Sequence, residues 1–173
     1  MPGHVILSHG SDSGPEATKV SALARVAEAL GWTTERPDYG DCDAQGLAES
    51  VTPRIERLRE RMRSSATPPV LAGSSMGAFA SGLASLEAPC AGLFLLALPP
   101  AIPGYLSTFD MAHDVPCMLI HGFEDEVCPP DAALAFARRR GMPTLMLADG
   151  HRLAGHVDRV EAQFRLFLEL LDA

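Results

Sequence analysis

The segment Gly73-Ser74-Ser75-Met76-Gly77 sets a serine between two glycines where an apolar stretch gives way to small, helix-compatible residues. This G-x-S-x-G spacing is typical of a sharp strand-to-helix turn that strains the backbone of its central residue and projects the side chain outward. The N–H of Met76 then lies at the start of a helix, where it can bind a developing oxyanion. The segment therefore predicts that Ser75 is a nucleophile.

A serine hydroxyl reacts only when a base takes its proton, and the base needs a group that orients it. Two later segments supply such residues. "LIHGFEDEVCPP" holds three acids, with Asp125 in the middle, and "LADGHRLAGH" holds His151 and His156. Both follow apolar stretches, and the order serine, acid, histidine is the one expected on a parallel sheet with a nucleophile elbow. The spacing alone leaves both histidines open as the base.

The elements that must position these residues alternate between strand and helix. Apolar runs predict strands at residues 5–8, 70–73, 90–98, 117–121 and 144–148, and we expect a further strand at 33–36. Helical spacing of apolar residues predicts helices at 16–30, 47–63, 76–86, 131–140 and along the last stretch of the chain, with Ser13 and Glu16 as a capping box for the first. The pattern predicts a three-layer α/β/α sandwich with a mostly or wholly parallel sheet of about six strands. In such sheets ligands bind at the carboxyl ends of the strands, where Ser75, Asp125 and His151 fall.

Composition excludes several classes of function. The 173 residues fit one domain spanning 1–173, and a net charge of −8 argues against nucleic acid and anionic membranes as partners. The stretch from Arg54 to Arg63 alternates with acids and apolar residues, which indicates a solvated helix face. No run is long enough for membrane insertion, and the first residues resemble a strand rather than a signal peptide, so we expect a cytoplasmic protein.

The four cysteines do not form a C-x-x-C pair, so their spacing does not support a zinc site. Cys90 and Cys117 lie in apolar runs, and Cys42 and Cys128 lie in predicted loops. We expect reduced thiols in a cytosolic protein.

Taken together and in order, "LSHGS", "GSSMG", "HGFEDEVCPP" and "DGHRL" resemble the motifs of small α/β-hydrolases, the compact, lid-poor serine esterases also described as dienelactone-hydrolase-like. The resemblance covers nearly the whole chain. It implies a minimal α/β-hydrolase fold without a cap domain and without the usual antiparallel opening strands. It also implies chemistry that needs no metal or organic cofactor.

Residue by residue, the resemblance makes Ser75 the nucleophile and Asp125 the acid of the family's H-G-x-x-D-x-x-V-P pattern. His151 matches the family's loop histidine, which is often followed by Arg-Leu as it is here. The family more often shows Gly-Asp-His where this chain has Asp-Gly-His, so His156 stays as the alternative base. The H-G turn after the first strand implies that the N–H of Ser11 is the second oxyanion donor, with His9 and His121 in structural roles.

These roles imply a serine hydrolase that cleaves short or exposed carboxylic esters of a small-molecule acyl substrate. An acyltransferase, a thioesterase, a lactone or carbon–carbon hydrolase, and a non-catalytic binding module are the alternatives. Between two late strands the stretch 99–116 is too short for a helical cap. We expect the apolar residues Ile102, Tyr105, Leu106 and Phe123 to line the substrate site. Four acids, Asp12, Asp38, Asp41 and Asp43, are expected around its mouth, where they would disfavour anionic substrates.

Overall fold

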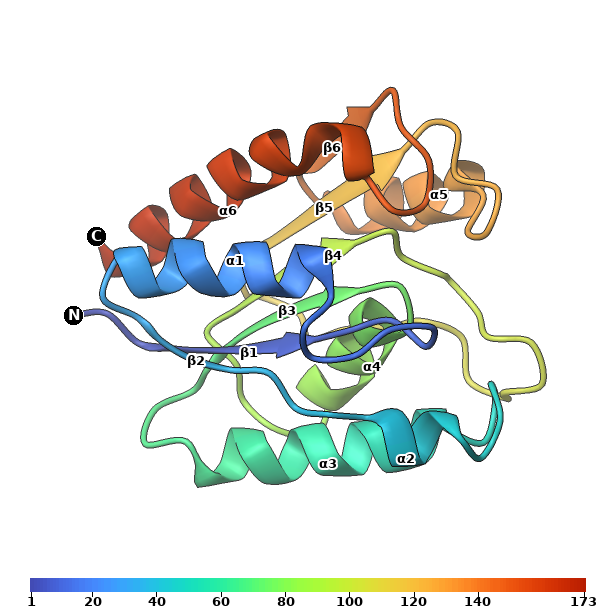
Figure 1. Ribbon diagram of the computed structural model, residues 1–173, viewed down its shortest axis with the longest axis horizontal. Coiled ribbons are helices and arrows are strands. Elements are labelled where there is room, and N and C mark those ends of the chain that lie inside the picture. Colours follow the sequence, from blue (N-terminus) through green and yellow to red (C-terminus); the bar gives the residue numbers. More distant parts are fainter.

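The computed structural model describes residues 1–173, and its centre is a six-stranded sheet in the order β2-β1-β3-β4-β5-β6 (Figure 1). All neighbouring strands are parallel. The strands are β1 (His4–Ser8), β2 (Thr33–Glu35), β3 (Val70–Ser74), β4 (Gly92–Leu96), β5 (Cys117–Gly122) and β6 (Thr144–Leu147). The predicted parallel sheet is confirmed.

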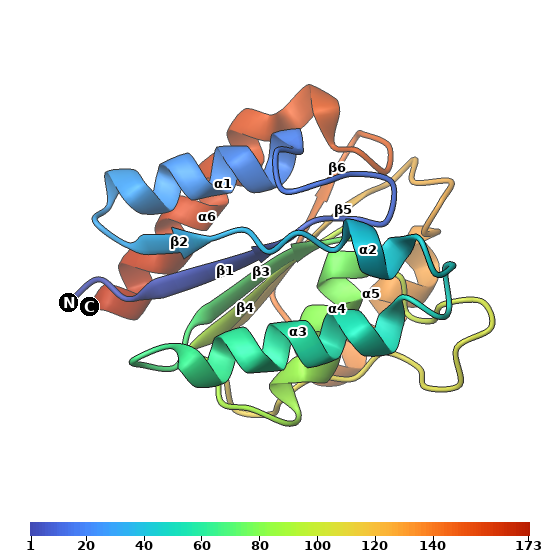
Figure 2. The ribbon, with the colours of Figure 1, turned by 60° about the horizontal axis from the view of Figure 1, so that its bottom comes forward.

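Helices cover both faces of the sheet, which makes three layers (Figure 2). One face carries α1 (Thr18–Ala29) and α6 (Val157–Asp172), which pack against each other, and a 3₁₀ turn, η1 (Ala154–His156), precedes α6. The other face carries α3 (Val51–Ser64), α4 (Met76–Ser85) and α5 (Pro130–Arg140), with the short α2 (Gly40–Asp43) ahead of α3. None of the helices is long and apolar enough to cross a membrane.

Alternating side chains of each strand fill two separate hydrophobic clusters, one on each face. On β1, Ile6 packs with the cluster under α3, α4 and α5, whereas Val5 and Leu7 pack with the cluster under α1 and α6. Every residue of β3 and β4 is buried. Strands covered on both faces read as continuous apolar runs, and this explains the pattern in the sequence.

The chain reverses its direction across the sheet at β1, whose neighbours are β2 on one side and β3 on the other. Loops that leave neighbouring strands toward opposite faces open a crevice at the carboxyl ends of those strands. The loop after β1 and the turn after β3 meet at this point. The two chain ends lie at the opposite edge, where the amino group of Met1 pairs with Asp172 at 2.7 Å (Figure 1).

Several predicted element ends were wrong. The expected loop at 37–46 contains α2, and α3 begins at Val51 rather than at residue 47. The predicted capping box does not form, because α1 begins at Thr18, beyond Glu16, and has no side-chain cap. Instead, the hydroxyl of Ser13 donates to the carbonyl of Gly10. The carbonyl of Pro15 and the carboxylate of Glu16 both accept hydrogen bonds from Arg36.

Candidate active site

Ser75 stands at the sharp turn between β3 and α4 with φ 56° and ψ −119°, a conformation that L-residues rarely adopt. The turn depends on close backbone approach. A Cβ at Gly73 would overlap the backbone of Gly77, and a Cβ at Gly77 would overlap the carbonyl group of Ser8 on β1. The glycines therefore let α4 sit against β1 and β3, and this packing holds the Ser75 side chain at the carboxyl edge of the sheet.

A continuous chain of hydrogen bonds joins three strand ends. The Ser75 Oγ lies 3.1 Å from Nε2 of His151, and Nδ1 of His151 lies 2.8 Å from Oδ2 of Asp125. Asp125 is 3% exposed and its other oxygen, Oδ1, accepts the N–H groups of Val127 at 3.0 Å and Cys128 at 2.7 Å. These bonds fix the carboxylate, which in turn orients the imidazole with its Nε2 lone pair toward the serine hydroxyl.

The remaining candidate histidines do not reach Ser75. His156 pairs with Asp149 at 2.9 Å at the start of α6, so it is not placed as the base. His9 is buried, with its Nδ1 donating to Gly10 O and its Nε2 accepting the N–H of Tyr39. Burial lowers the pKa of His9 and keeps the ring neutral. His121, also buried, donates from Nε2 to the carbonyl of Cys128 at 2.7 Å and lies 3.3 Å from Asp125.

A cavity of about 420 Å³ opens beside Ser75 and His151. Three segments form its walls: the loop after β1 with the first turn of α1, Val127 from the loop after β5, and the loop between β6 and α6. Ser11, predicted as an oxyanion donor, lies on this wall, and Met76 stands at the first position of α4 directly after Ser75. Both predicted donors therefore belong to segments that meet at the serine.

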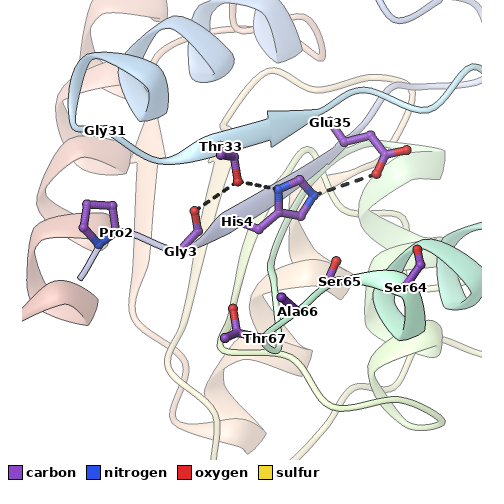
Figure 3. Close-up of a pocket in the computed structure, with 10 residues that line it drawn as sticks. All are labelled: Pro2, Gly3, His4, Gly31, Thr33, Glu35, Ser64, Ser65, Ala66 and Thr67. Atoms are coloured by element: carbon purple, nitrogen blue, oxygen red, sulfur yellow. Dashed lines mark hydrogen bonds and ion pairs between the residues drawn. The ribbon is translucent and has the colours of Figure 1, made fainter.

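Another cavity, of about 440 Å³, lies at the opposite edge of the sheet (Figure 3). Its centre is His4, whose Nδ1 lies 2.8 Å from the Thr33 hydroxyl and whose Nε2 is 3.8 Å from Glu35. The Thr33 hydroxyl donates to the carbonyl of Gly3, so its proton is not aimed at the imidazole. This cluster lacks a strained turn or helix start that could hold an oxyanion, and the site at Ser75 remains the candidate active site.

The chain has a close counterpart among solved structures. A Xanthomonas campestris pv. campestris protein assigned to the alpha/beta hydrolase superfamily is 43% identical, and the match covers 98% of both chains with a TM-score of 0.90. The chain belongs to the α/β-hydrolase superfamily. No family model matches the sequence, and no curated protein matches it.

More distant structures share the α/β-hydrolase fold. Another Xanthomonas campestris protein, described as an α/β serine hydrolase without a lid, is 18% identical over 98% of this chain and 83% of its own, with a TM-score of 0.69. Est1E from Butyrivibrio proteoclasticus is 18% identical over 98% of this chain and 88% of its own, with a TM-score of 0.76. The predicted α/β-hydrolase fold without a lid is confirmed.

The stretch between β4 and β5, where larger α/β-hydrolases carry a cap, packs on the face of the sheet that carries α3, α4 and α5. Ile102 is buried in the cluster under α4, and Tyr105 contacts Phe79 edge to face. Leu106 is fully exposed and Phe123 is 59% exposed. None of these four residues lines the cavity at Ser75, so the geometry does not support the predicted substrate lining. Apolar residues in a loop do not recur at a fixed spacing, so the sequence does not show which face of the sheet they cover.

The expected ring of acids around the mouth is also wrong except at Asp12, which lies on the cavity wall. Asp41 pairs with Arg57 at 2.6 Å, and Asp43 pairs with Arg54 at 2.6 Å. Asp38 accepts the N–H of Gly40 within its own turn. These three acids are engaged beside α2 and α3.

Arg54 is the residue that sequence reasoning misplaced most clearly. The interpretation as a solvated face is wrong here, because Arg54 is 0% exposed. Its guanidinium donates to both oxygens of Asp43, to the carbonyl of His9 at 2.6 Å and to that of Gly10 at 3.1 Å. It thus anchors the loop after β1 that carries Ser11. Helical spacing from Val51 to Leu58 already puts position 54 on the buried stripe, and this signal could have found it.

A metal ion has one conceivable set of ligands here, Asp125, Cys128 and His151, whose donor atoms lie within 4.8 Å of one another. The arrangement fits a metal poorly. The His151 nitrogen and Asp125 oxygen that would bind the ion already bind each other. Burial, with the negative charge of Asp125, raises the pKa of the Cys128 thiol to about 12, so the thiolate that a metal needs does not form near neutral pH.

Proposed function

We propose that the chain is a serine hydrolase that cleaves short or exposed carboxylic esters through an acyl-enzyme. The observation that carries the proposal is the continuous hydrogen-bonded chain from Ser75 through His151 to Asp125 at the carboxyl edge of the sheet. A strained serine at a helix start, beside an oriented imidazole, is the arrangement that activates a hydroxyl for attack on a carbonyl carbon. We also infer that residues 1–173 act as one domain, because both hydrophobic clusters form on the same sheet.

In the proposed reaction, His151 Nε2 takes the hydroxyl proton as Ser75 Oγ bonds to the ester carbonyl carbon. Asp125 stabilises the imidazolium that results. The backbone N–H groups of Met76 and Ser11 bind the oxyanion, and loss of one such donor raises the barrier by about 3 kcal/mol. The C–O bond to the alcohol breaks, and the alcohol leaves with the proton from His151. Water, deprotonated by the same imidazole, then cleaves the acyl-serine ester and restores the hydroxyl.

The site has no cap above it, and this supports short or exposed esters as its substrates. The stretch 99–116 packs away from Ser75, and the cavity of about 420 Å³ suits a small acyl group. Est1E from Butyrivibrio proteoclasticus has been solved with ferulic acid bound, so a protein of this fold holds a small carboxylic acid. At 18% identity that likeness extends to the fold and does not identify the substrate of this chain.

The experiment measures hydrolysis of 4-nitrophenyl esters of increasing acyl length by the native chain, Ser75→Ala and His151→Ala. We expect the short esters to be cleaved fastest, and both substitutions to lower kcat by about 10⁴-fold or more because the two residues act as a unit. Products formed with added alcohols separate hydrolysis from acyl transfer, and a thioester and a lactone in the panel test the other acyl substrates. A folded native chain that cleaves no acyl compound would overturn the proposal in favour of a binding module.

A further inference from the structure

The cavity beside Ser75 contains a lysine from a distant part of the chain. Lys19 lies in the first turn of α1, and its Nζ donates to the backbone carbonyl of His151 at 3.2 Å. An ammonium group has three donors, and this bond uses one of them. Lys19 lines the cavity together with Ser75 and His151, so its remaining donors are available to a molecule bound there.

Two cationic side chains, Lys19 and Arg152, line the cavity together with one carboxylate, Asp12. Arg152 and Asp12 are both exposed and lie on different walls of the cavity, Asp12 in the loop after β1 and Arg152 in the loop between β6 and α6. Asp125 and Asp149 also act on Lys19, but neither lines the cavity. Asp125 accepts hydrogen bonds from His151 and two backbone N–H groups, and Asp149 pairs with His156. The positive end of the α1 dipole also lies at the cavity, because residues 17–20 line it and no side chain caps the helix. The side chains that line the cavity thus carry one more positive than negative charge, whereas the whole chain carries a net charge of −8.

Partial burial makes the ammonium responsive to a bound anion. Burial and the nearby Arg152 lower the pKa of Lys19 to about 8, against the opposing effect of Asp125 and Asp149. The side chain is therefore mostly cationic at pH 7 and lacks a carboxylate partner within salt-bridge distance. A partly desolvated charge is stabilised when an anion binds beside it.

We propose that Lys19 forms a subsite for an anionic group in the active-site cavity, so that the preferred substrates are esters that also carry a carboxylate. The inference rests on the proposed ester hydrolysis at Ser75 and names its substrate class. Lys19 does not enter the bond-making steps. It selects the substrate by pairing with a carboxylate at another position of the same ester molecule.

The test compares two esters of nearly equal length, 4-nitrophenyl pentanoate and the 4-nitrophenyl monoester of glutaric acid, after subtraction of the uncatalysed rates. The readout is the ratio of kcat/KM for the anionic ester to that for the neutral one. Lys19→Gln removes the charge but keeps an N–H donor for the carbonyl of His151. Arg63→Gln, at an exposed position near the end of α3, makes the same change in net charge far from the cavity.

We expect the native chain and Arg63→Gln to favour the anionic ester, and Lys19→Gln to lower the ratio by about tenfold, which is the worth of one charge-assisted hydrogen bond. In the native chain the ratio should fall as the pH rises through about 8, where Lys19 loses its proton, and it should be flat in Lys19→Gln. A general loss of active-site order would lower both rates and leave the ratio unchanged.

Equal ratios in the three proteins, with both esters cleaved, would overturn the subsite and leave the proposed hydrolase intact. Cleavage of neither ester, nor of any other in the panel, by the folded native chain would overturn the proposed function and the subsite with it. A native preference for the neutral ester would also contradict the subsite.

Discussion

Asp125 illustrates how individual contacts decide what a side chain can do at this site. Its Oδ1 is committed to two backbone N–H groups, and its Oδ2 faces Nδ1 of His151. The side chain therefore holds one rotamer and one orientation. A residue that replaces Asp125 keeps the hydrogen bonds to the two backbone N–H groups only if its side chain presents an oxygen to them.

This geometry predicts the effect of Asp125→Asn. The amide oxygen satisfies the two N–H groups, so the NH₂ group points at His151 and favours the tautomer with a proton on Nε2. That tautomer cannot accept the proton of Ser75, and we expect kcat to fall by about 10⁴-fold with little loss of stability. Ester hydrolysis and thermal unfolding of the same sample check both parts. Asp149→Asn is the matched control, because its partner is His156 rather than His151, and a comparable loss there would contradict the assignment.

At the scale of elements, the packing of α4 against β1 controls the conformation of Ser75. Gly77 sits where a side chain would overlap the Ser8 carbonyl. We expect Gly77→Ala to push α4 away from the sheet, to cost about 1–3 kcal/mol of unfolding free energy and to lower activity together with stability. Urea unfolding and ester hydrolysis measure the two effects. Ala80→Gly, on the same helix, tests whether any change in α4 has this result, and full activity in Gly77→Ala would contradict the packing account.

A further prediction concerns the helix α3 and the loop after β1. Arg54 pairs with Asp43 and binds two carbonyl groups of that loop from a fully buried position. We expect Arg54→Leu to destabilise the fold by about 3–5 kcal/mol, because it leaves a largely buried carboxylate and two carbonyls without their partner. Urea unfolding measures the loss, with the exposed Arg63→Leu on the same helix as control. Equal losses of unfolding free energy in the two variants would contradict a stabilising role of the buried pair of Arg54 and Asp43.

At the scale of the whole molecule, a buried tyrosine links stability to pH. Tyr39 is 0% exposed, and burial raises its pKa to about 12, while its hydroxyl shares a hydrogen bond with Ser8 at 3.0 Å. The folded state therefore keeps a proton that the unfolded state loses near pH 10. This contribution to stability is complete below about pH 10 and disappears as the pH rises toward 12, by up to about 3 kcal/mol. Unfolding free energies between pH 9 and 11.5 should fall less steeply in Tyr39→Phe, and identical slopes would contradict the link.

The sequence predicts the fold well because strand–helix alternation and buried apolar runs are local patterns. Ser75, Asp125 and His151 could be found because each follows a strand, and the carboxyl ends of parallel strands share one edge. The cavity could not be predicted in the same way. Lys19 reaches His151 across more than a hundred residues. Helical spacing marks position 54 as buried, but the partners of Arg54, which are Asp43 and the loop after β1, lie outside that helix. Such contacts depend on tertiary packing, which leaves no period in the sequence.

The central claim, that His151 and Asp125 activate Ser75, is tested most directly by the intact mass of the protein after reaction with a fluorophosphonate. We expect the native chain and Ser74→Ala to gain one phosphonyl group, Ser75→Ala to gain none, and His151→Ala to react at least about a hundredfold more slowly. The neighbouring Ser74 is the sharpest control, since it shares the motif but not the hydrogen bond to His151. Labelling that persists in Ser75→Ala, or a folded native chain that takes up no label, would contradict the account.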